Sequence, residues 1–385
     1  MSRKKQKQKP GKRNIRHNIA ANQEKHRSDW LPLQPDEEGQ VADRRIMRRD
    51  EQDRRLEVAE AATATTFEPF DESLWQQMAE ASPFELGLVV EVSRGLARVD
   101  FGDEILVCDI RGTLIAEETG YTNIVAVGDR ALVSRQSWRR GLLEEVLPRR
   151  SGLARADSFD THLRQLLVAN VDQLLIVTAW REPQIWFQMI DEYLIGGMRN
   201  HLQAVICVNK VDLADHVLEC RMAMQPYVEM GHRVLFTSTM TEYGLEELRE
   251  TLAGRTTVLA GLSGVGKSSL LTAVDPHLDL KTGEVSSLKS REGRHTTTQA
   301  VLHPLTGGGY VIDTPGIKDM GLLGLYPEDL LDYYPEVAAV LGKCRFRNCS
   351  HENEPGCAVQ TAVSDGRILE WRFQNYQNLY DKLAE

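Results

Sequence analysis

The sequence has 385 residues, of which 42% are hydrophobic and 26% charged, and its formal net charge is −10. This length allows two or three domains with separate hydrophobic cores. No apolar run approaches the ~18 residues of a membrane-spanning helix, and none follows the N-terminus, so we expect neither a membrane protein nor a secretory signal.

The N-terminal region is strongly basic. Residues 1–18 contain eight Lys or Arg and no acidic residue, so the rest of the chain carries −18. A basic tail on an acidic body predicts a polyanionic partner, although a solvated, disordered tail without a partner has the same composition. A mitochondrial presequence is disfavoured because the tail is rich in Lys and has little apolar face. We interpret residues 1–83 as a basic, then charged extension that is largely disordered, with a possible helix at 44–62.

Residues 84–150 contain short β-type runs separated by glycine turns. Four or five strands in so short a segment predict a small β-barrel of the OB type, and an SH3-like barrel would give a similar pattern. The runs are ELGLVVEVSRGLARVDF, EILVCDIRG, NIVAVGDRALVSRQ and RGLLEEVLP.

OB barrels bind single-stranded nucleic acid through basic grooves and aromatic stacking. The barrel segment is rich in arginine, with Arg94, Arg98, Arg111, Arg135, Arg139 and Arg140. Aromatic residues between them are few beyond Tyr121 and Trp138. We therefore expect contacts to a structured RNA or to a protein as readily as base stacking.

Residues 151–326 alternate between apolar strand-like runs and helical stretches. This pattern predicts a doubly wound, mostly parallel α/β sheet. Strands are predicted at 172–180, 203–210, 232–238, 255–261 and 309–316, with a helix at 244–254.

The segment GLSGVGKSS at 261–269 matches the phosphate-binding loop pattern GxxxxGK[ST] and lies between an apolar strand and a helical run. Its backbone N–H groups would hold the α- and β-phosphates of a nucleoside triphosphate. Lys267 would reach the β- and γ-phosphates and Ser268 would bind Mg²⁺. The predicted loop residues are Gly261, Leu262, Ser263, Gly264, Val265, Gly266, Lys267, Ser268 and Ser269.

The motif Asn209-Lys210-Val211-Asp212 ends a predicted strand. Asp212 can accept hydrogen bonds from the N1–H and 2-amino groups of guanine, which adenine does not offer. We expect Asn209 to tie this loop to the phosphate loop and the Lys210 stem to cover the base. Thr237 and Ser238 end the next strand and belong to a third base-contacting loop. Alone, NKVD is a weak signal that also fits a polar loop; beside a phosphate loop it indicates guanine specificity.

The segment DTPG follows the last predicted strand. Asp313 would hold Mg²⁺ through water, and the Gly316 N–H would contact the γ-phosphate. Between the phosphate loop and DTPG lies SREGRHTTTQ, where Thr296, Thr297 or Thr298 supplies a second Mg²⁺ hydroxyl; we assign Thr297. A flexible loop without this role is the alternative reading. The base-reading motif thus precedes the phosphate loop, which predicts a circularly permuted domain.

Residues 327–385 are predicted to be helical around the pattern C-x4-C-x-H-x5-C, formed by Cys344, Cys349, His351 and Cys357. Three thiolates and one imidazole make a closed tetrahedral shell for one structural Zn²⁺ per chain. Four unligated residues are the alternative. The remaining cysteines are scattered and suggest no disulfide framework, so a reducing cytosol fits best.

With these motifs, residues 84–385 resemble the circularly permuted bacterial GTPases known as the ribosome small-subunit-dependent GTPase family (RsgA, also YjeQ). NKVD, GLSGVGKSS, GRHTTT, DTPG and CRFRNCSHENEPGC occur in the order of that family. The resemblance implies hydrolysis of GTP to GDP and phosphate, stimulated by the 30S subunit during its late maturation. It further implies that the barrel and the zinc domain contact the ribosome, including 16S rRNA. We also expect the protein to be a cytoplasmic monomer. The long N-terminal extension departs from the family, and its role stays open.

The residue after Gly316 usually carries the Gln that orients the attacking water, and here it is Ile317. The resembling family also has an apolar residue there, and a His before the Thr cluster, which corresponds to His295, is implicated in hydrolysis. An imidazole near the γ-phosphate can orient or polarise water, although a solvent-exposed loop histidine is the plain alternative. The predicted catalytic residues are His295, Lys267 and Asp313.

Two other functions fit parts of the sequence. A GTP-dependent RNA- or ribosome-binding module without significant hydrolysis agrees with Ile317. A P-loop kinase or ATPase would agree with the phosphate loop but conflicts with NKVD.

Overall fold

The computed structural model describes residues 71–93, 95–111, 124–156, 164–278, 300–313, 322, 325–346, 349, 351 and 354–384. All of them belong to one compact unit, Val58–Glu385. The predicted basic tail and the possible helix at 44–62 lie outside the described residues. Within the described ranges, no helix is both long and apolar enough to cross a membrane.

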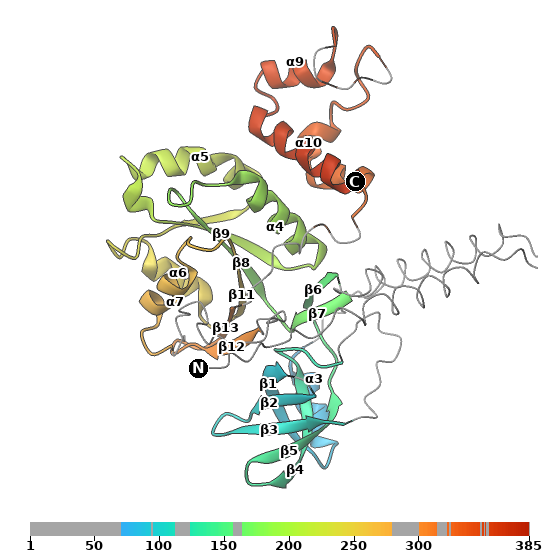
Figure 1. The fold of residues 1–385 in the computed structure, drawn as a ribbon, viewed down its shortest axis with the longest axis vertical. Coiled ribbons are helices and arrows are strands. Elements are labelled where there is room, and N and C mark those ends of the chain that lie inside the picture. The colour runs from blue at the N-terminus through green and yellow to red at the C-terminus, as the bar shows by residue number, and fades with distance from the viewer. Residues whose placement is uncertain are drawn as a thin grey trace, which may run out of the picture. The chain divides into compact units, whose positions relative to one another are not determined.

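The first domain is a closed five-stranded barrel (Figure 1). Its strands are β1 (Glu85–Ser93), β2 (Leu96–Asp100), β3 (Ile105–Ile110), β4 (Arg130–Ser137) and β5 (Arg140–Val146). They run in the order β1-β2-β3-β5-β4, and β4 pairs back with β1. The pair β3–β5 is parallel and the others are antiparallel. Alternate residues such as Val89, Val99 and Leu106 fill the interior. The predicted OB-type barrel is confirmed.

The second domain is a doubly wound sheet whose central strands are parallel. Its strands are β8 (Gln173–Ala179), β9 (Gln203–Asn209), β10 (Arg233–Phe236), β11 (Thr256–Ala260) and β13 (Tyr310–Asp313), in the order β10-β9-β8-β11-β13. Helices α4 (Phe187–Arg199) and α5 (Val217–Glu229) pack on one face, and α6 (Leu245–Leu252) and α7 (Lys267–Val274) on the other.

The environment of β8 explains why its sequence is a continuous apolar run. Leu174 and Ile176 lie in the core under α4 and α5, whereas Leu175 and Val177 lie in the core under α6 and α7. Every residue of β8 is buried, as expected for a parallel strand that is covered on both faces.

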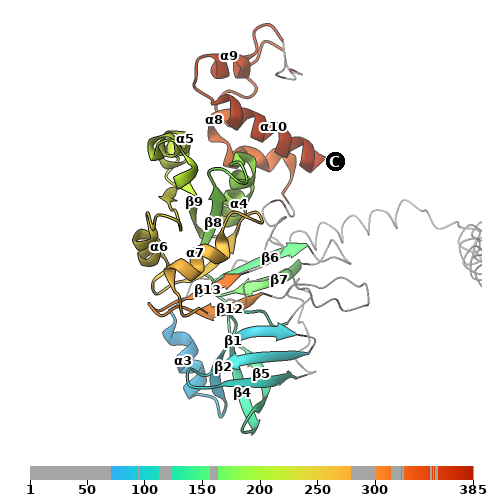
Figure 2. The same ribbon diagram turned by 60° about the vertical axis from the view of Figure 1, so that its left-hand side comes forward.

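A short strand joins the two domains into one sheet of eleven strands. β12 (Val301–Pro304) lies between β13 and β1 (Figure 2). Val301 is paired both with Glu91 of the barrel and with Asp313 of β13, in antiparallel register. Neither this strand nor the hairpin of β6 (Gly152–Ala156) and β7 (Arg164–Ala169) was predicted.

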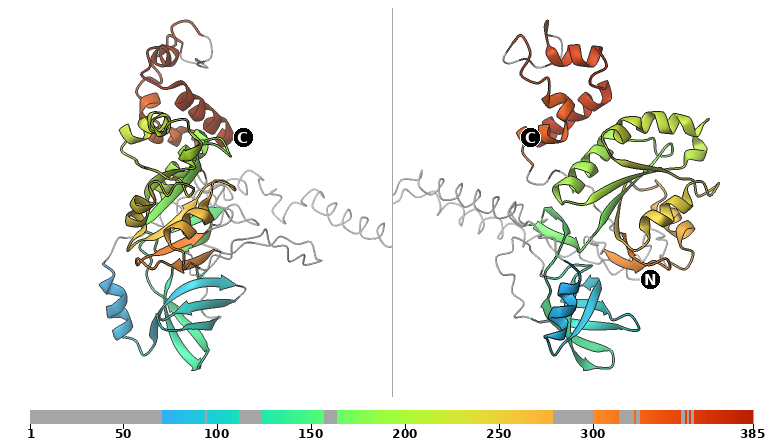
Figure 3. Two further views of the ribbon diagram at one scale, coloured as in Figure 1. Left: turned by 90° about the vertical axis from the view of Figure 1, so that its left-hand side faces the viewer. Right: turned by 180° about the vertical axis from the view of Figure 1, so that it is seen from behind.

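The N-terminal extension is not unstructured throughout. Helix α3 (Ser73–Glu80) lies beside the barrel (Figure 3). Its Trp75 is buried against Leu132 and Leu147 and donates a hydrogen bond from Nε1 to the Pro148 carbonyl at 2.9 Å. Within the extension that was predicted to be largely disordered, residues 73–80 therefore form a helix, and one buried tryptophan anchors it. The proposed domain boundaries after residues 83, 150 and 326 stay predictions.

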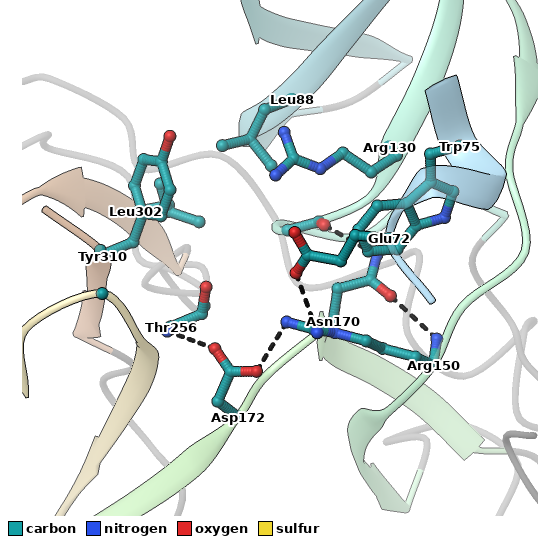
Figure 4. Close-up of a pocket in the computed structure, with 13 residues that line it drawn as sticks. Glu72, Trp75, Leu88, Arg130, Arg150, Asn170, Asp172, Thr256, Leu302 and Tyr310 are labelled. Carbon is teal, nitrogen blue, oxygen red and sulfur yellow. Dashed lines mark hydrogen bonds and ion pairs between the residues drawn. The ribbon is translucent and has the colours of Figure 1, made fainter. Parts of the chain in front are cut away.

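Arg150 joins α3, the barrel and the parallel sheet (Figure 4). Its guanidinium pairs with Glu72 at 2.9 Å and with Asp172 at 2.6 Å, and Asp172 also accepts the Thr256 N–H at 2.6 Å. A cavity of about 150 Å³ lies beside this network. Because Asp172 and Thr256 stand at the amino ends of β8 and β11, this junction lies at the edge of the sheet opposite to the strands' carboxyl ends.

The C-terminal part is helical, as predicted. It comprises η3 (Pro327–Tyr333), α8 (Pro335–Ala338), α9 (Ala358–Ser364) and α10 (Glu370–Ala384). Leu330, Tyr334, Val337, Val359 and Leu379 are completely buried in its own core.

A buried ionic network attaches this helical domain to α4. Asp191, with a side chain only 1% exposed, pairs with Arg372 of α10 at 2.9 Å. The carboxylate also accepts hydrogen bonds from Asn375 at 2.6 Å, Tyr227 at 2.9 Å and Tyr334 at 3.1 Å. Burial raises the pKa of Asp191, while Arg372 and these three donors favour its ionised form.

We predict that Asp191→Ala destabilises this attachment by about 3 kcal/mol. Removing one partner of a buried pair typically costs about 3–5 kcal/mol, and the lower end applies because Glu336 still pairs with Arg372 at 2.8 Å. Thermal unfolding followed by circular dichroism, with trypsin cleavage of the C-terminal domain, measures the effect.

The neighbouring Glu192→Gln is the matched control. Its pair with Lys382 at 3.2 Å is partly exposed, so the loss should be at most about 1 kcal/mol. Equal losses for the two variants would contradict the proposed anchoring role of Asp191.

Candidate nucleotide site and metal centre

The carboxyl ends of the parallel strands meet at one edge of the sheet. β9 ends at Asn209, which is paired with Ala179 at the end of β8. β11 ends one residue after Leu259, which is paired with Asp313 on β13. The chain adds β9 and β10 on one side of β8 and then β11 and β13 on the other. Open α/β sheets bind ligands at such a reversal of strand order, and the predicted motifs lie there.

The loop between β11 and α7 is shaped by glycine. Gly261, Gly264 and Gly266 have φ values of 140°, 82° and 95°, which residues with a Cβ rarely adopt. At Gly266 space is required as well, since a Cβ would lie 2.5 Å from Nδ2 of Asn209. Lys267 begins α7, so Ser268 and Ser269 belong to its first turn. This is the strand–loop–helix arrangement that a phosphate-binding loop requires.

Asn209 connects the two predicted halves of the site. Its buried side chain donates from Nδ2 to the Val265 carbonyl at 2.9 Å and accepts the Thr237 hydroxyl at 3.3 Å. The predicted tie between the NKVD loop and the phosphate loop is therefore present.

Two lysines bind carbonyl groups of the phosphate loop. Lys267 donates from Nζ to the carbonyls of Gly261 at 3.0 Å and Leu262 at 2.9 Å. Lys210 donates to the Gly264 carbonyl at 2.8 Å and to the Glu182 carbonyl. A phosphate oxygen bound by Lys267 would replace these carbonyls with a charged acceptor, which forms stronger hydrogen bonds.

Asp212 is exposed at the start of the short helix η1 (Val211–Leu213), and its carboxylate is bound by the side chain of Ser238. The buried Ser238 donates its hydroxyl to Oδ1 of Asp212 and accepts the N–H groups of Met240 and Thr241 at 3.2 Å each. These bonds fix the NKVD loop against the loop after β10. The remaining acceptor sites of the Asp212 carboxylate stay available for a base.

The loop after β8 is a part of the site that the motifs did not reveal. The Trp180 N–H binds the Asn209 carbonyl at 2.9 Å, and Arg181 donates to the Leu213 carbonyl at 3.0 Å. Lys210 reaches Glu182 in the same loop. The position of this loop in the sequence could have revealed it, because the loop also follows the carboxyl end of a central strand.

Several predicted site residues are not described. His295, Thr297, Gly316 and Ile317 lie outside the described residues, as do Thr296 and Thr298. Asp313 is placed by its backbone at the end of β13, beside the strand that leads into the phosphate loop.

The four predicted zinc ligands come together. The ligand atoms of Cys344, Cys349, His351 and Cys357 all lie within 4.8 Å of one another. Cys344 Sγ is 3.9 Å from Cys357 Sγ, and His351 Nδ1 is 3.5 Å and 3.4 Å from these two sulfurs. A tetrahedral ion with Zn–S bonds of about 2.3 Å separates its sulfurs by about 3.8 Å. The donor set and its spacing therefore fit zinc.

Backbone N–H groups support the cluster. The Ala358 N–H donates to Cys344 Sγ and the Gln360 N–H to Cys357 Sγ, both at 3.4 Å. Burial opposes ionisation of Cys344, but the N–H groups of Ala358 and Val359 lower the pKa of its thiol overall. Gln360 also donates to the His351 carbonyl. Such outer contacts orient metal ligands and stabilise thiolates.

Comparison with known proteins finds relatives over most of the chain. The family model described as RsgA GTPase matches residues 146–323. The chain is 39% identical over 282 residues to the small ribosomal subunit biogenesis GTPase RsgA of Moorella thermoacetica. The aligned region covers 73% of this chain and 91% of that protein. It is 38% identical over 301 residues to the protein of the same name from Gemmatimonas aurantiaca, with coverage of 77% and 97%.

Two solved structures are also similar. YjeQ from Thermotoga maritima is 32% identical with a TM-score of 0.58, covering 78% of this chain and 98% of that chain. YloQ, described as a circularly permuted GTPase, is 26% identical with a TM-score of 0.55, covering 78% and 95%.

We predict that Cys344→Ser abolishes stoichiometric zinc binding. The wild-type chain, prepared with zinc present, should hold one zinc ion, and the variant should hold close to none, because a serine hydroxyl is a poor ligand where zinc prefers a thiolate. Metal analysis of the purified proteins measures this. Cys220→Ala, which removes a buried thiol outside the cluster, should retain the ion. Zinc retained by Cys344→Ser, or absent from the wild type, would contradict the assignment.

Proposed function

This chain belongs to the RsgA GTPase family, and we propose that it hydrolyses GTP to GDP and phosphate on the small ribosomal subunit during late maturation of that particle. The observation that carries the proposal is the hydrogen bond from Asn209 to the Val265 carbonyl, at 2.9 Å. It joins a guanine-type motif to a phosphate-type loop in one site. The relatives named above are small ribosomal subunit biogenesis GTPases.

The proposed GTP contacts come from four loops. The 261–269 loop binds the phosphates, with Lys267 at the β- and γ-phosphates. Asp212 accepts from the guanine edge, while Lys210 covers the base and Asn209 holds the two loops together. Thr237 and Ser238 support the base-contacting loop, and the Gly316 N–H contacts the γ-phosphate.

Mg²⁺ would complete this site. Ser268, Thr297 and Asp313 are the proposed ligands, the last through water. The ion would neutralise charge on the phosphates. The position of Ser268 in the first turn of α7 and of Asp313 at the end of the neighbouring β13 supports this assignment.

Activation of water is assigned to His295. Ile317 has no polar group with which to orient water, so another residue must do so. A histidine can accept a proton from water or align it at neutral pH. We propose that docking on the ribosomal particle brings His295 to the γ-phosphate.

The other domains are the proposed ribosome contacts. The barrel and the C-terminal domain with its zinc ion bind the particle, including 16S rRNA, and the basic residues 1–18 add affinity for polyanions. We propose that the protein acts as a monomer in the cytoplasm.

The decisive experiment is GTP hydrolysis with purified 30S, 50S and 70S particles added in turn. We expect stimulation by 30S above the other particles. A chain that only binds GTP would show no stimulation. If the chain were an ATPase, added ATP would displace labelled GTP from it.

We predict that His295→Ala keeps the affinity for GTP but loses 30S-stimulated turnover by about 10²-fold or more, the usual contribution of a general acid–base group. His277→Ala provides a histidine control outside the predicted loop and should behave like the wild type. Stimulated turnover that survives in His295→Ala would refute the assignment.

A further inference from the structure

The hairpin of β4 and β5 ends in an exposed tryptophan. Trp138 is 73% exposed, more than any other aromatic side chain of the described residues. It stands in the two-residue connection between Ser137 and Arg140, which are register partners. Residues 135–140 are all exposed, so the end of this hairpin extends beyond the barrel core.

The tip is also basic. Residues 135–140 contain three arginines and no acid. Arg135 is engaged by Glu85 at 2.8 Å and Glu104 at 2.6 Å, and Arg140 lies 3.5 Å from Asp109. Arg139 differs, because within the described part of the chain it forms no ion pair. Its guanidinium carbon lies 4.1 Å from the centre of the Trp138 ring.

The barrel itself does not need Trp138. The barrel core is formed by buried residues such as Val133 and Leu143 further along the same two strands. A cation–π contact at an exposed site contributes only modestly, and any long side chain could occupy this turn. The indole instead presents an exposed aromatic ring beside the positive charge of the Arg139 guanidinium.

Such an arrangement fits an unpaired nucleobase. Bases stack on aromatic rings whatever their identity, and neighbouring arginines bind the phosphates. OB barrels use the loop between their fourth and fifth strands for nucleic acid. Protein interfaces also use tryptophan and arginine, but at centres that are well packed and excluded from water. The other residues of 135–140 are all polar or charged and exposed, which favours RNA.

We infer that the β4–β5 tip binds single-stranded RNA by stacking one unpaired base on Trp138, with Arg139 holding the adjacent phosphate. The inference rests on the proposed function for the nature of the partner, an RNA-rich particle. The sequence of the barrel left open whether it contacts structured RNA, a protein or an unpaired base. The inference selects stacking on an unpaired base.

The test uses the full chain and a 12-nucleotide oligouridylate RNA with one central 2-aminopurine. Anisotropy of an end label measures affinity, and quenching of 2-aminopurine measures stacking, which a basic tail bound to phosphates does not produce. Trp138→Ala should abolish the quenching and weaken binding about tenfold. Trp138→Phe should retain most of both, because the aromatic face persists.

Trp138→Leu separates RNA stacking from a hydrophobic protein contact, since it keeps apolar volume without a ring. We expect Trp138→Leu to behave like Trp138→Ala. Arg139→Gln should lower the slope of log affinity against log salt by about 0.7, the value for one phosphate contact on a single strand, while Trp138→Leu leaves this slope unchanged. Trp186→Ala, which removes an exposed aromatic ring just before α4 and outside both proposed RNA-binding domains, is the control and should bind like the wild type.

Equal quenching by the wild type, Trp138→Leu and Trp138→Ala would overturn the inference, as would a wild type that does not quench. If Trp138→Ala instead loses RNA-independent binding to ribosomal proteins and Trp138→Leu retains it, the tip is a protein contact and the inference fails. The 30S-stimulated hydrolysis of the wild type is measured in parallel. Stimulation without quenching rejects only the stacking inference, whereas quenching without stimulation rejects only the proposed function.

Discussion

One hydrogen bond, from the Asn209 amide to the Val265 carbonyl, connects the proposed base-reading and phosphate-binding halves of the site. It requires β9 and β11 to lie on either side of β8 and Gly266 to leave room for the amide. It does not require any particular order of these strands along the chain. The strand that carries the guanine-type motif therefore comes first here and the phosphate loop later, and the contact between the two loops is preserved. Circular permutation changes the connections of a domain while preserving the contacts on which its chemistry depends.

The two flanking domains are attached to this sheet in different ways. The barrel is joined through the backbone, because Val301 is paired with both Glu91 and Asp313. The C-terminal domain is held by side chains, through the buried Asp191–Arg372 pair on α4. Helix α4 begins directly after the loop whose Glu182 carbonyl binds Lys210. A single secondary-structure element, β12 or α4, therefore separates each flanking domain from the proposed nucleotide site. A rearrangement at that site can be transmitted to the flanking domains through these elements.

Elements that leave a pattern in their own residues were predicted well, and elements that depend on contacts with distant residues were missed. The strands β8, β9 and β11 were predicted to within about two residues, since burial on both faces leaves an apolar run in the sequence. The strand β12 was missed because four residues containing His303 and Pro304 carry no period of their own. Its pairing with Glu91 comes from a partner far away in the chain. Helix α3 was assigned to a disordered extension because a single residue, Trp75, provides most of its anchoring.

The sequence by itself determined the chemistry: a phosphate loop, a guanine-type motif and three thiolates with one imidazole. These features are readable because each is formed by residues close together in the chain, whose types and spacing the ligand dictates. Only the tertiary structure decided what each element contacts. That Asp191 holds Arg372 and that Val301 joins the barrel to the parallel sheet depend on packing between distant segments. Local composition does not encode those distances, because they arise from how all the buried surfaces fit together.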